Sequence, residues 1–273
     1  MSKKGKNTRK AKGNSNTQAV TRHPNRTDKH TSRTEKGMKD IVDDHKINNE
    51  SYSLDWFSPT EGQQDVVRSM IENELTLVQA SSGAGKSTTV IWQALKDLKA
   101  GYYKSILFVK TPNESSDDLI GFLPSSEENK LSVHFEATRS VFHQFMTKEK
   151  LVMEEKKGRI NFKIPNFIQG ATFEDTLMIL DESQSLSPST MKLVMERVGR
   201  GSKIVVCADK RQRYSYRKRE DGFTNFVNMV TAVDEDGRYS NVDTIGYVEM
   251  PASANMRSDL SRLIVTLYEE DDE

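Results

Sequence analysis

The segment ASSGAGKST, residues 80–88, places glycine, lysine and hydroxyl side chains at a spacing that suits a bound chain of phosphates. Gly83 and Gly85 allow backbone N–H groups to turn inward around phosphate oxygens. Lys86 can reach the β- and γ-phosphates, and the Ser87 hydroxyl can ligate magnesium at the start of a helix. The segment therefore predicts an ATP site with Mg²⁺, with the binding residues Ser82, Gly83, Ala84, Gly85, Lys86, Ser87 and Thr88.

A second group of chemically capable residues follows in TLMILDESQ, residues 176–184, where an apolar run leads to Asp181 and Glu182. Ligands of open α/β sheets bind at the carboxyl ends of strands, so Asp181 is expected to hold the magnesium and Glu182 to polarise the attacking water. An acidic pair at a strand end can also be a solvated turn. Combined with a phosphate-binding loop upstream, it indicates a Walker-B site, and the second carboxylate favours hydrolysis over kinase chemistry.

A third strand end occurs in CADKRQR, residues 207–213. The strand ending at Cys207 is expected to neighbour the one ending at Leu180, which would place Asp209 and Gln212 beside the γ-phosphate. Gln212 is then suited to sense whether that phosphate is present. Taken alone, the segment would be an ordinary charged loop.

These residues need a sheet and helices to bring them together. Apolar, β-branched runs predict strands, and amphipathic patterns between them predict helices. Alternation of the two predicts a mainly parallel, doubly wound α/β sheet. Ser187 followed by Pro188 is typical of a helix start, and Gly199 or Gly201 is expected to end that helix. The predicted strands are 75–79, 105–109, 176–180, 203–207 and 245–249, and the predicted helices are 63–72, 86–99, a long stretch around 132–155, 188–197, 222–231 and 257–268.

Charge divides the chain unevenly. Although 40 Lys and Arg residues balance 40 Asp and Glu residues, residues 1–38 are strongly basic and residues 269–273 are all acidic. A basic arm with few apolar residues cannot offset the entropy of folding, so residues 1–50 are predicted to be a disordered arm and linker, and residues 51–273 the folded domain. The arm is either a solubilising tail or a tether to nucleic acid or another anionic surface.

The rest of the composition limits the class of protein. Cys207 is the single cysteine, which excludes an internal disulfide framework. No apolar run approaches the length of a membrane span, and no apolar segment follows the basic N-terminus as in a signal peptide. A soluble cytoplasmic protein is therefore expected.

With these segments in place, residues from about Thr60 to Leu267 resemble the PhoH-like ATPase family, a single RecA-like domain related to superfamily-one helicases. The resemblance rests on ASSGAGKST, KTPNESSDDLIGFLP, LDESQSLSPSTMKLVMERVGRGSKIVVCADKRQ and DGF. It implies that Gln63 contacts adenine and that Gln184 joins Gln212 as a sensor of the γ-phosphate. It also suggests that Arg257 completes the site, often from a neighbouring subunit, so a homo-oligomer such as a ring is expected. The expected catalytic residues are Lys86, Glu182, Gln184, Gln212 and Arg257.

Several positions depart from the family pattern. Ala80 stands where the first glycine of the phosphate-binding loop is usual, and Thr111 replaces an arginine of the second motif. Gln169 and Ala171 replace the arginines that commonly flank Gly170. If those arginines serve nucleic acid or subunit contacts, this chain has weakened or rerouted them.

The run KRQRYSYRKR, residues 210–219, interleaves tyrosines with cations directly after the third strand end. Aromatic rings can stack bases while cations follow phosphates, although a charged run can also be a solvated face with tyrosines used in packing. The candidate nucleic-acid residues are Lys110, Arg211, Arg213, Tyr214, Tyr216 and Arg217. We therefore expect a Mg²⁺-dependent ATPase coupled to RNA or single-stranded DNA. The alternatives are an ATP-gated assembly or stress factor and, less favoured because no arginine-rich acceptor lid is found, a P-loop kinase.

Overall fold

The computed structural model describes residues 52–110, 135–209, 221–232, 244–250, 254 and 258–270 of the 273-residue chain. The predicted basic arm and linker, residues 1–50, lie outside the described residues, so their disorder stays a prediction. The described strands are β1 (Leu75–Ala80), β2 (Ser105–Lys110), β3 (Ile160–Lys163), β4 (Thr176–Asp181), β5 (Lys203–Ala208) and β6 (Ile245–Met250).

Helices alternate with these strands along the chain. They are α2 (Glu61–Glu72), α3 (Lys86–Ala100), α5 (Glu136–Phe142), α6 (Lys148–Lys156), α7 (Pro188–Met195), α8 (Gly222–Thr231) and α9 (Asp259–Glu270), with short 3₁₀ turns η2 (Pro165–Ile168) and η3 (Ser183–Ser185).

The described strands form a six-stranded sheet in the order β3-β2-β4-β5-β1-β6, and every pairing is parallel. The predicted neighbours β4 and β5 do pair, with Leu180 opposite Val206. β5 therefore lies between β1, which leads into the phosphate-binding loop, and β4, which ends at the acidic pair. This order gives the chain the RecA-like P-loop fold, a doubly wound α/β architecture as predicted.

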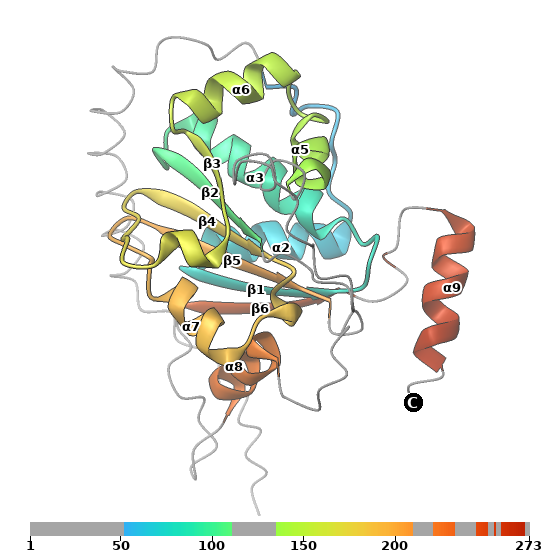
Figure 1. The fold of residues 1–273 in the computed structure, drawn as a ribbon. Helices are drawn as coiled ribbons and strands as arrows, with labels where there is room; N and C mark the ends of the chain where they lie inside the picture. The colour runs from blue at the N-terminus through green and yellow to red at the C-terminus, as the bar shows by residue number, and fades with distance from the viewer. Residues whose placement is uncertain are drawn as a thin grey trace, which may run out of the picture.

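Helices cover both faces of the sheet. Because successive side chains of a strand point to opposite faces, both sets of side chains are buried. On one face, Val78, Phe108 and Ile179 pack with α2, α3, α5 and α6. On the other, Leu77 and Val206 pack with α7 and α8. Figure 1 shows α7 and α8 on one side of the sheet and α2 and α3 on the other. The continuous apolar runs of the strands follow from this double burial.

The region between β2 and β4 was only partly predicted. The structure places two helices, α5 and α6, where one long helical stretch was expected, and then the short edge strand β3. β3 was missed because only four residues pair with β2, and among them Ile160 alone is fully enclosed. Phe162 on this strand packs on Phe108 and Phe142, so tertiary contacts with the neighbouring strand and helix stabilise β3.

The start of α7 follows its sequence signal. Ser187 is the N-cap, its side chain accepts a hydrogen bond from the backbone N–H of Thr190, and Pro188 occupies the first turn. The helix ends at Met195, ahead of the glycines expected to end it.

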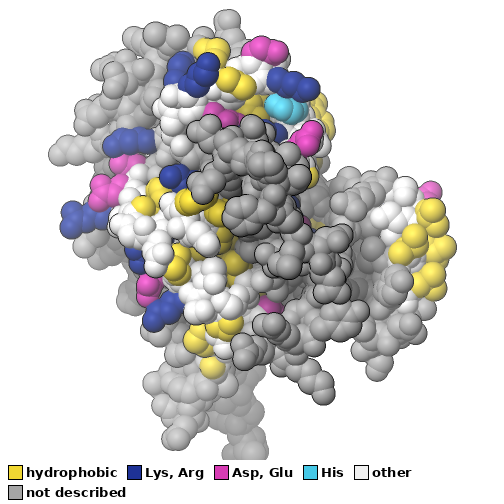
Figure 2. All heavy atoms as spheres, viewed as in Figure 1, with side chains coloured by type: hydrophobic (Ala, Val, Ile, Leu, Met, Phe, Trp, Pro, Cys, Tyr) yellow, Lys and Arg dark blue, Asp and Glu magenta, His cyan; other side chains and the backbone are white. Residues whose placement is uncertain are grey.

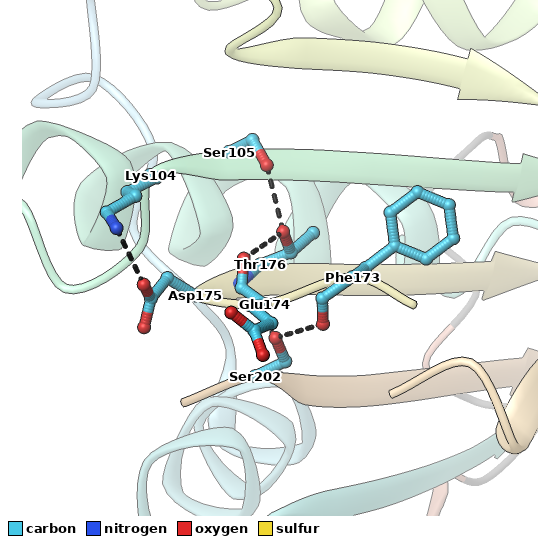
Figure 3. Close-up of polar contacts among 7 residues, drawn as sticks. All are labelled: Lys104, Ser105, Phe173, Glu174, Asp175, Thr176 and Ser202. Carbon is cyan, nitrogen blue, oxygen red and sulfur yellow. Dashed lines mark hydrogen bonds and ion pairs between the residues drawn. The ribbon is translucent and has the colours of Figure 1, made fainter. Parts of the chain in front are cut away.

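Hydroxyl groups align the amino-terminal ends of the central strands (Figure 3). Ser105 Oγ and Thr176 Oγ1 lie 3.0 Å apart across β2 and β4. Ser202 Oγ accepts from the backbone N–H of Thr176 at 2.9 Å and donates to the carbonyl of Phe173 at 2.7 Å. These bonds support the strand register at one edge of the sheet, and the same register brings the carboxyl ends together at the opposite edge.

Candidate nucleotide-binding site

The turn between β1 and α3 has the backbone shape that its glycines suggested. Gly83 and Gly85 adopt positive φ values of 83° and 79°, a conformation that favours glycine. Gly85 is the N-cap of α3, so the amino end of this 15-residue helix opens directly from the turn. Backbone N–H groups at a helix start form a favourable site for an anion.

Ala80, the departure from the usual loop pattern, fits its position. It is the last residue of β1, it pairs with Met250 of β6, and its side chain is buried in the core. Its φ is not among the positive values of the described residues. An alanine side chain therefore brings no backbone strain here.

Lys86, the first residue of α3, folds its side chain back along the loop. Its Nζ donates to the carbonyls of Ala80 at 2.5 Å and Ser81 at 3.1 Å. The ammonium group thus lies within the loop that the phosphates are expected to occupy. Ser82 and Thr88, which precede and follow Lys86 in the chain, are half-buried, and Ala84 is buried.

Ser87 and Asp181 join the first and second chemical segments. Ser87 Oγ donates to Asp181 Oδ2 at 2.9 Å, although 94 residues separate them in the chain. Asp181 is only 6% exposed, and burial, with a smaller contribution from the charge of Glu182, raises the pKa of its carboxyl group. The positive charge of Lys110, opposite Asp181 in the sheet register, partly counters this shift.

One hydroxyl and one buried carboxylate suit a small, hard cation such as Mg²⁺, which prefers oxygen ligands and is held by one or two protein groups. A cation placed between them would relieve the unfavourable burial of the Asp181 charge. Within the described part of the chain, no cluster of three or more His, Cys, Asp or Glu side chains could hold a metal ion.

The helices were also compared with the length and hydropathy that a membrane span requires. Among the described residues, none of them meets both requirements.

Glu182 has an unusual backbone conformation for a residue with a side chain. Its φ of 55° and ψ of 37° are left-handed, a conformation uncommon outside glycine. Its carboxylate Oε2 accepts from Gln184 Nε2 at 2.6 Å. The amide oxygen of Gln184 accepts in turn from the backbone N–H of Asp209 at 3.0 Å. Gln184 therefore connects the acidic pair at the end of β4 to the residue that follows β5.

Ser183 is a site residue that sequence reasoning missed. Its buried hydroxyl donates to the carbonyl of Cys207 at 2.8 Å and ties η3 to β5. A small hydroxyl residue between an acidic pair and a glutamine was a weak signal for this contact. Cys207 itself is fully buried in the core, and this burial raises the pKa of its thiol well above the usual value.

Gln63 lies beneath the loop at the start of α2. It is 1% exposed, and its amide contacts the backbone of both Thr60 and Ala84. The adenine contact expected for it stays a prediction.

Other expected site residues cannot be placed. Gln212 and Arg257 lie outside the described residues, as do Thr111 and, among the nucleic-acid candidates, Arg211, Arg213, Tyr214, Tyr216 and Arg217. Lys110 ends β2 at the same sheet edge as Asp181. Gln169 and Ala171 flank Gly170 after η2, and Gln169 is exposed.

Comparison with known proteins gives one family. The sequence profile described as PhoH-like protein matches residues 58–269. A PhoH-like protein of Bacillus subtilis is 25% identical over 211 residues, covering 77% of this chain and 63% of that relative. Protein PhoH of Escherichia coli is 24% identical over 154 residues, covering 55% and 42% respectively. The chain thus spans about half the length of these curated relatives. Among solved structures, a Thermus phage large terminase ATPase domain matches with a TM-score of 0.44 and 12% identity, over 80% of this chain and 87% of that chain.

Proposed function

Because the chain belongs to the PhoH-like protein family, we propose that it is a Mg²⁺-dependent ATPase whose turnover is coupled to RNA or single-stranded DNA in a homo-oligomer. The observation that carries the ATPase proposal is the contact between Ser87 Oγ and Asp181 Oδ2. It brings the phosphate-binding loop and the acidic strand end together at one edge of the sheet, where a nucleotide and a cation would meet.

Each residue of the site then has a distinct task. The backbone N–H groups of Gly83 to Gly85 bind phosphate oxygens, and Lys86 exchanges its loop carbonyls for the β- and γ-phosphates. Ser87 and Asp181 would hold Mg²⁺, which would supply positive charge to offset the negative charge of the phosphates. Glu182 orients and polarises the attacking water.

Gln184 gives Glu182 its orientation in this proposal. The short hydrogen bond between their side chains holds the carboxylate, and the second bond of Gln184 reaches Asp209. The basic run of residues 210–219 begins at the next residue. A change in the position of this run on binding a nucleic acid would therefore be transmitted to the Glu182 carboxylate through one side chain, that of Gln184. This short connection supports the coupling.

Helix α9 supports the oligomer. It stands apart from the sheet in Figure 1, and Figure 2 shows hydrophobic side chains along it. Leu260, Leu263, Ile264 and Leu267 are 66%, 56%, 45% and 55% exposed and recur at a helical spacing. A neighbouring copy that covers this face would also come close to Arg257, two residues before α9.

Phosphate release from the purified chain tests the ATPase proposal. We expect release that requires magnesium and falls at least a hundredfold in Lys86→Ala and in Glu182→Gln, in line with about 10²–10⁴-fold for a positioned catalytic base. Lys99→Ala is the matched control, because Lys99 is an exposed lysine on the same helix. Release that survives both site substitutions would overturn the site assignment.

The same assay with poly(U) or single-stranded DNA tests the coupling. We expect the polymer to raise the rate of phosphate release at low salt. This stimulation should decline as the salt concentration rises. No stimulation by either polymer would favour the ATP-gated assembly factor.

A further inference from the structure

The DGF segment, residues 221–223, forms the start of α8. Asp221 is the N-cap, and its side chain accepts a hydrogen bond from the backbone N–H of Thr224 at 2.7 Å. Phe223 is fully buried on the sheet face that α7 and α8 cover. Gly222 lies between these two residues, so the cap and the buried ring hold it in place.

Gly222 contacts the backbone that follows the acidic pair. Its N–H donates to the carbonyl of Leu186 at 2.8 Å. A Cβ added at Gly222 would lie 2.8 Å from the carbonyl oxygen of Ser187 and 2.9 Å from Met191 Cβ, closer than real Cβ contacts allow. The φ of Gly222 is not among the positive values of the described residues. Its missing side chain therefore serves the close approach of α8 and not a special backbone conformation.

The contacted backbone belongs to residues 182–187, which we call the Glu182 segment. The short turn η3 separates Leu186 from Glu182. Within it, the N–H of Leu186 donates to the carbonyl of Ser183 and the N–H of Ser185 donates to the carbonyl of Glu182, both at 3.1 Å. Because these bonds join the turn from end to end, a displacement of Leu186 would also move the backbone of Glu182.

Two contacts hold the Glu182 segment to the chain that follows β5. The N–H of Asp209 bonds the side chain of Gln184, and the N–H of Gly222 bonds the backbone two residues further on. In the sequence, the basic run of residues 210–219 lies between Asp209 and Gly222. The chain on both sides of this run therefore contacts the Glu182 segment.

We propose that Gly222 is a positioning residue for ATP hydrolysis, because its close contact with residues 186–187 fixes the backbone that carries Glu182. This inference rests on the proposed ATPase function. A misplaced catalytic group slows the chemical step even when the substrate still binds. None of the hydrogen bonds of this contact involves the phosphate-binding loop, so the affinity for the nucleotide should not depend on Gly222.

Steady-state phosphate release from Gly222→Ala tests this role, together with titration calorimetry of a non-hydrolysable ATP analogue. We expect kcat to fall about tenfold, because a misplacement of about 1 Å can cost a hundredfold and the added methyl group requires a smaller shift. The dissociation constant of the analogue should keep its wild-type value.

Gly199→Ala is the matched control for overpacking. A Cβ at Gly199 would lie 2.5 Å from the carbonyl oxygen of Phe173, and the φ of Gly199 is likewise not among the positive values. The two substitutions thus force a methyl group against a backbone carbonyl, but Gly199 lies in the turn before β5, at the opposite edge of the sheet from Glu182. We expect wild-type kcat in this control.

Asp221→Ala is a second variant, which loosens the first turn of α8 without adding volume. It should lower kcat in the same direction by a smaller factor. Thr147→Ala is its control, because the Thr147 side chain caps α6 by accepting from the backbone N–H of Lys150 at 3.2 Å. If Gly222→Ala does not fold, the comparison of Asp221→Ala with Thr147→Ala decides the inference.

Hydrogen exchange gives a readout that does not depend on activity. In Gly222→Ala we expect faster exchange in a peptide covering residues 182–187, while a peptide covering residues 80–88 keeps its wild-type rate. Wild-type kcat in folded Gly222→Ala, or an equal loss of kcat in Gly199→Ala, would overturn the inference. If the wild type itself releases no phosphate, the proposed function fails and the catalytic role of Gly222 fails with it.

Discussion

At the scale of single residues, Glu182 is the most informative position. A non-glycine residue in the left-handed region costs on the order of 1 kcal/mol or more, and such strain persists where surrounding contacts over-determine it. Here those contacts come from Gln184, whose amide bonds Glu182 Oε2, and from Ser185, whose hydroxyl donates to the Glu182 carbonyl at 2.7 Å. These contacts hold the strained backbone and fix the position of the Glu182 carboxylate. A fixed position is what the proposed role of Glu182, to orient the attacking water, requires.

We predict that Gln184→Ala lowers the kcat of ATP hydrolysis by about 10–100-fold and changes KM less, because Glu182 loses the donor that orients it. Gln184→Glu should lower kcat as well, since it places a second carboxylate against Glu182 while keeping an acceptor for the Asp209 N–H. Steady-state phosphate release measures both, and thermal unfolding checks that the variants fold. Wild-type kcat in both variants would contradict the orienting role.

At the scale of elements, α2 packs so closely against the edge strand β6 that one position of the strand has no room for a side chain. Gly246 of β6 has no room for a side chain, because a Cβ there would lie 2.1 Å from Ser69 Oγ and 2.4 Å from Asn73 Nδ2. These two side chains bond to each other, and Ser69 Oγ also lies 3.1 Å from Thr76 Oγ1 of β1. A small residue on the strand thus permits a polar contact between the helix and the neighbouring strand.

We predict that Gly246→Ala lowers the free energy of unfolding by about 1–3 kcal/mol, the usual cost of overpacking. Gly62→Ala is the control at the same interface, because its nearest neighbour would be a Met250 side-chain atom at an ordinary 3.8 Å. That change should be neutral or stabilising, because alanine has a higher helix propensity than glycine. Urea unfolding measures both, and equal stability of the two variants would show that the edge relaxes freely.

At the scale of the whole molecule, the described chain has a closed two-sided core and one amphipathic helix outside it. The RecA-like sheet buries both faces, whereas the apolar face of α9 is exposed. The family profile extends through residue 269, so nearly all of this helix lies within the matched region. A homo-oligomer would bury the face and bring the segment that contains Arg257 to a neighbouring site.

We predict that Leu263→Ser together with Leu267→Ser weakens self-association by at least tenfold, because burial of one leucine contributes about 1.5–3 kcal/mol. Arg262→Ser, on the opposite side of α9, should leave association unchanged. Mass photometry with a non-hydrolysable ATP analogue measures the assembly state. A wild-type monomer under all conditions would contradict the oligomer.

Features that depend on neighbouring residues could be predicted from the sequence. The glycines specified the loop between β1 and α3, five apolar runs located β1, β2, β4, β5 and β6, and the acidic pair marked the end of β4. These signals are readable because positive φ, strand burial and helix capping are requirements of local backbone geometry.

Contacts between distant segments could not be predicted in this way, because they arise from the packing of the folded chain. The four-residue strand β3 forms because β2 offers an open edge, and its sequence alone is too short to signal a strand. The hydrogen bonds of Gln63 to Ala84 and of Gln184 to Asp209 cross 21 and 25 residues of chain. Such bonds depend on how the helices and strands pack, and that packing determines which polar groups lose water and must find a partner inside the protein.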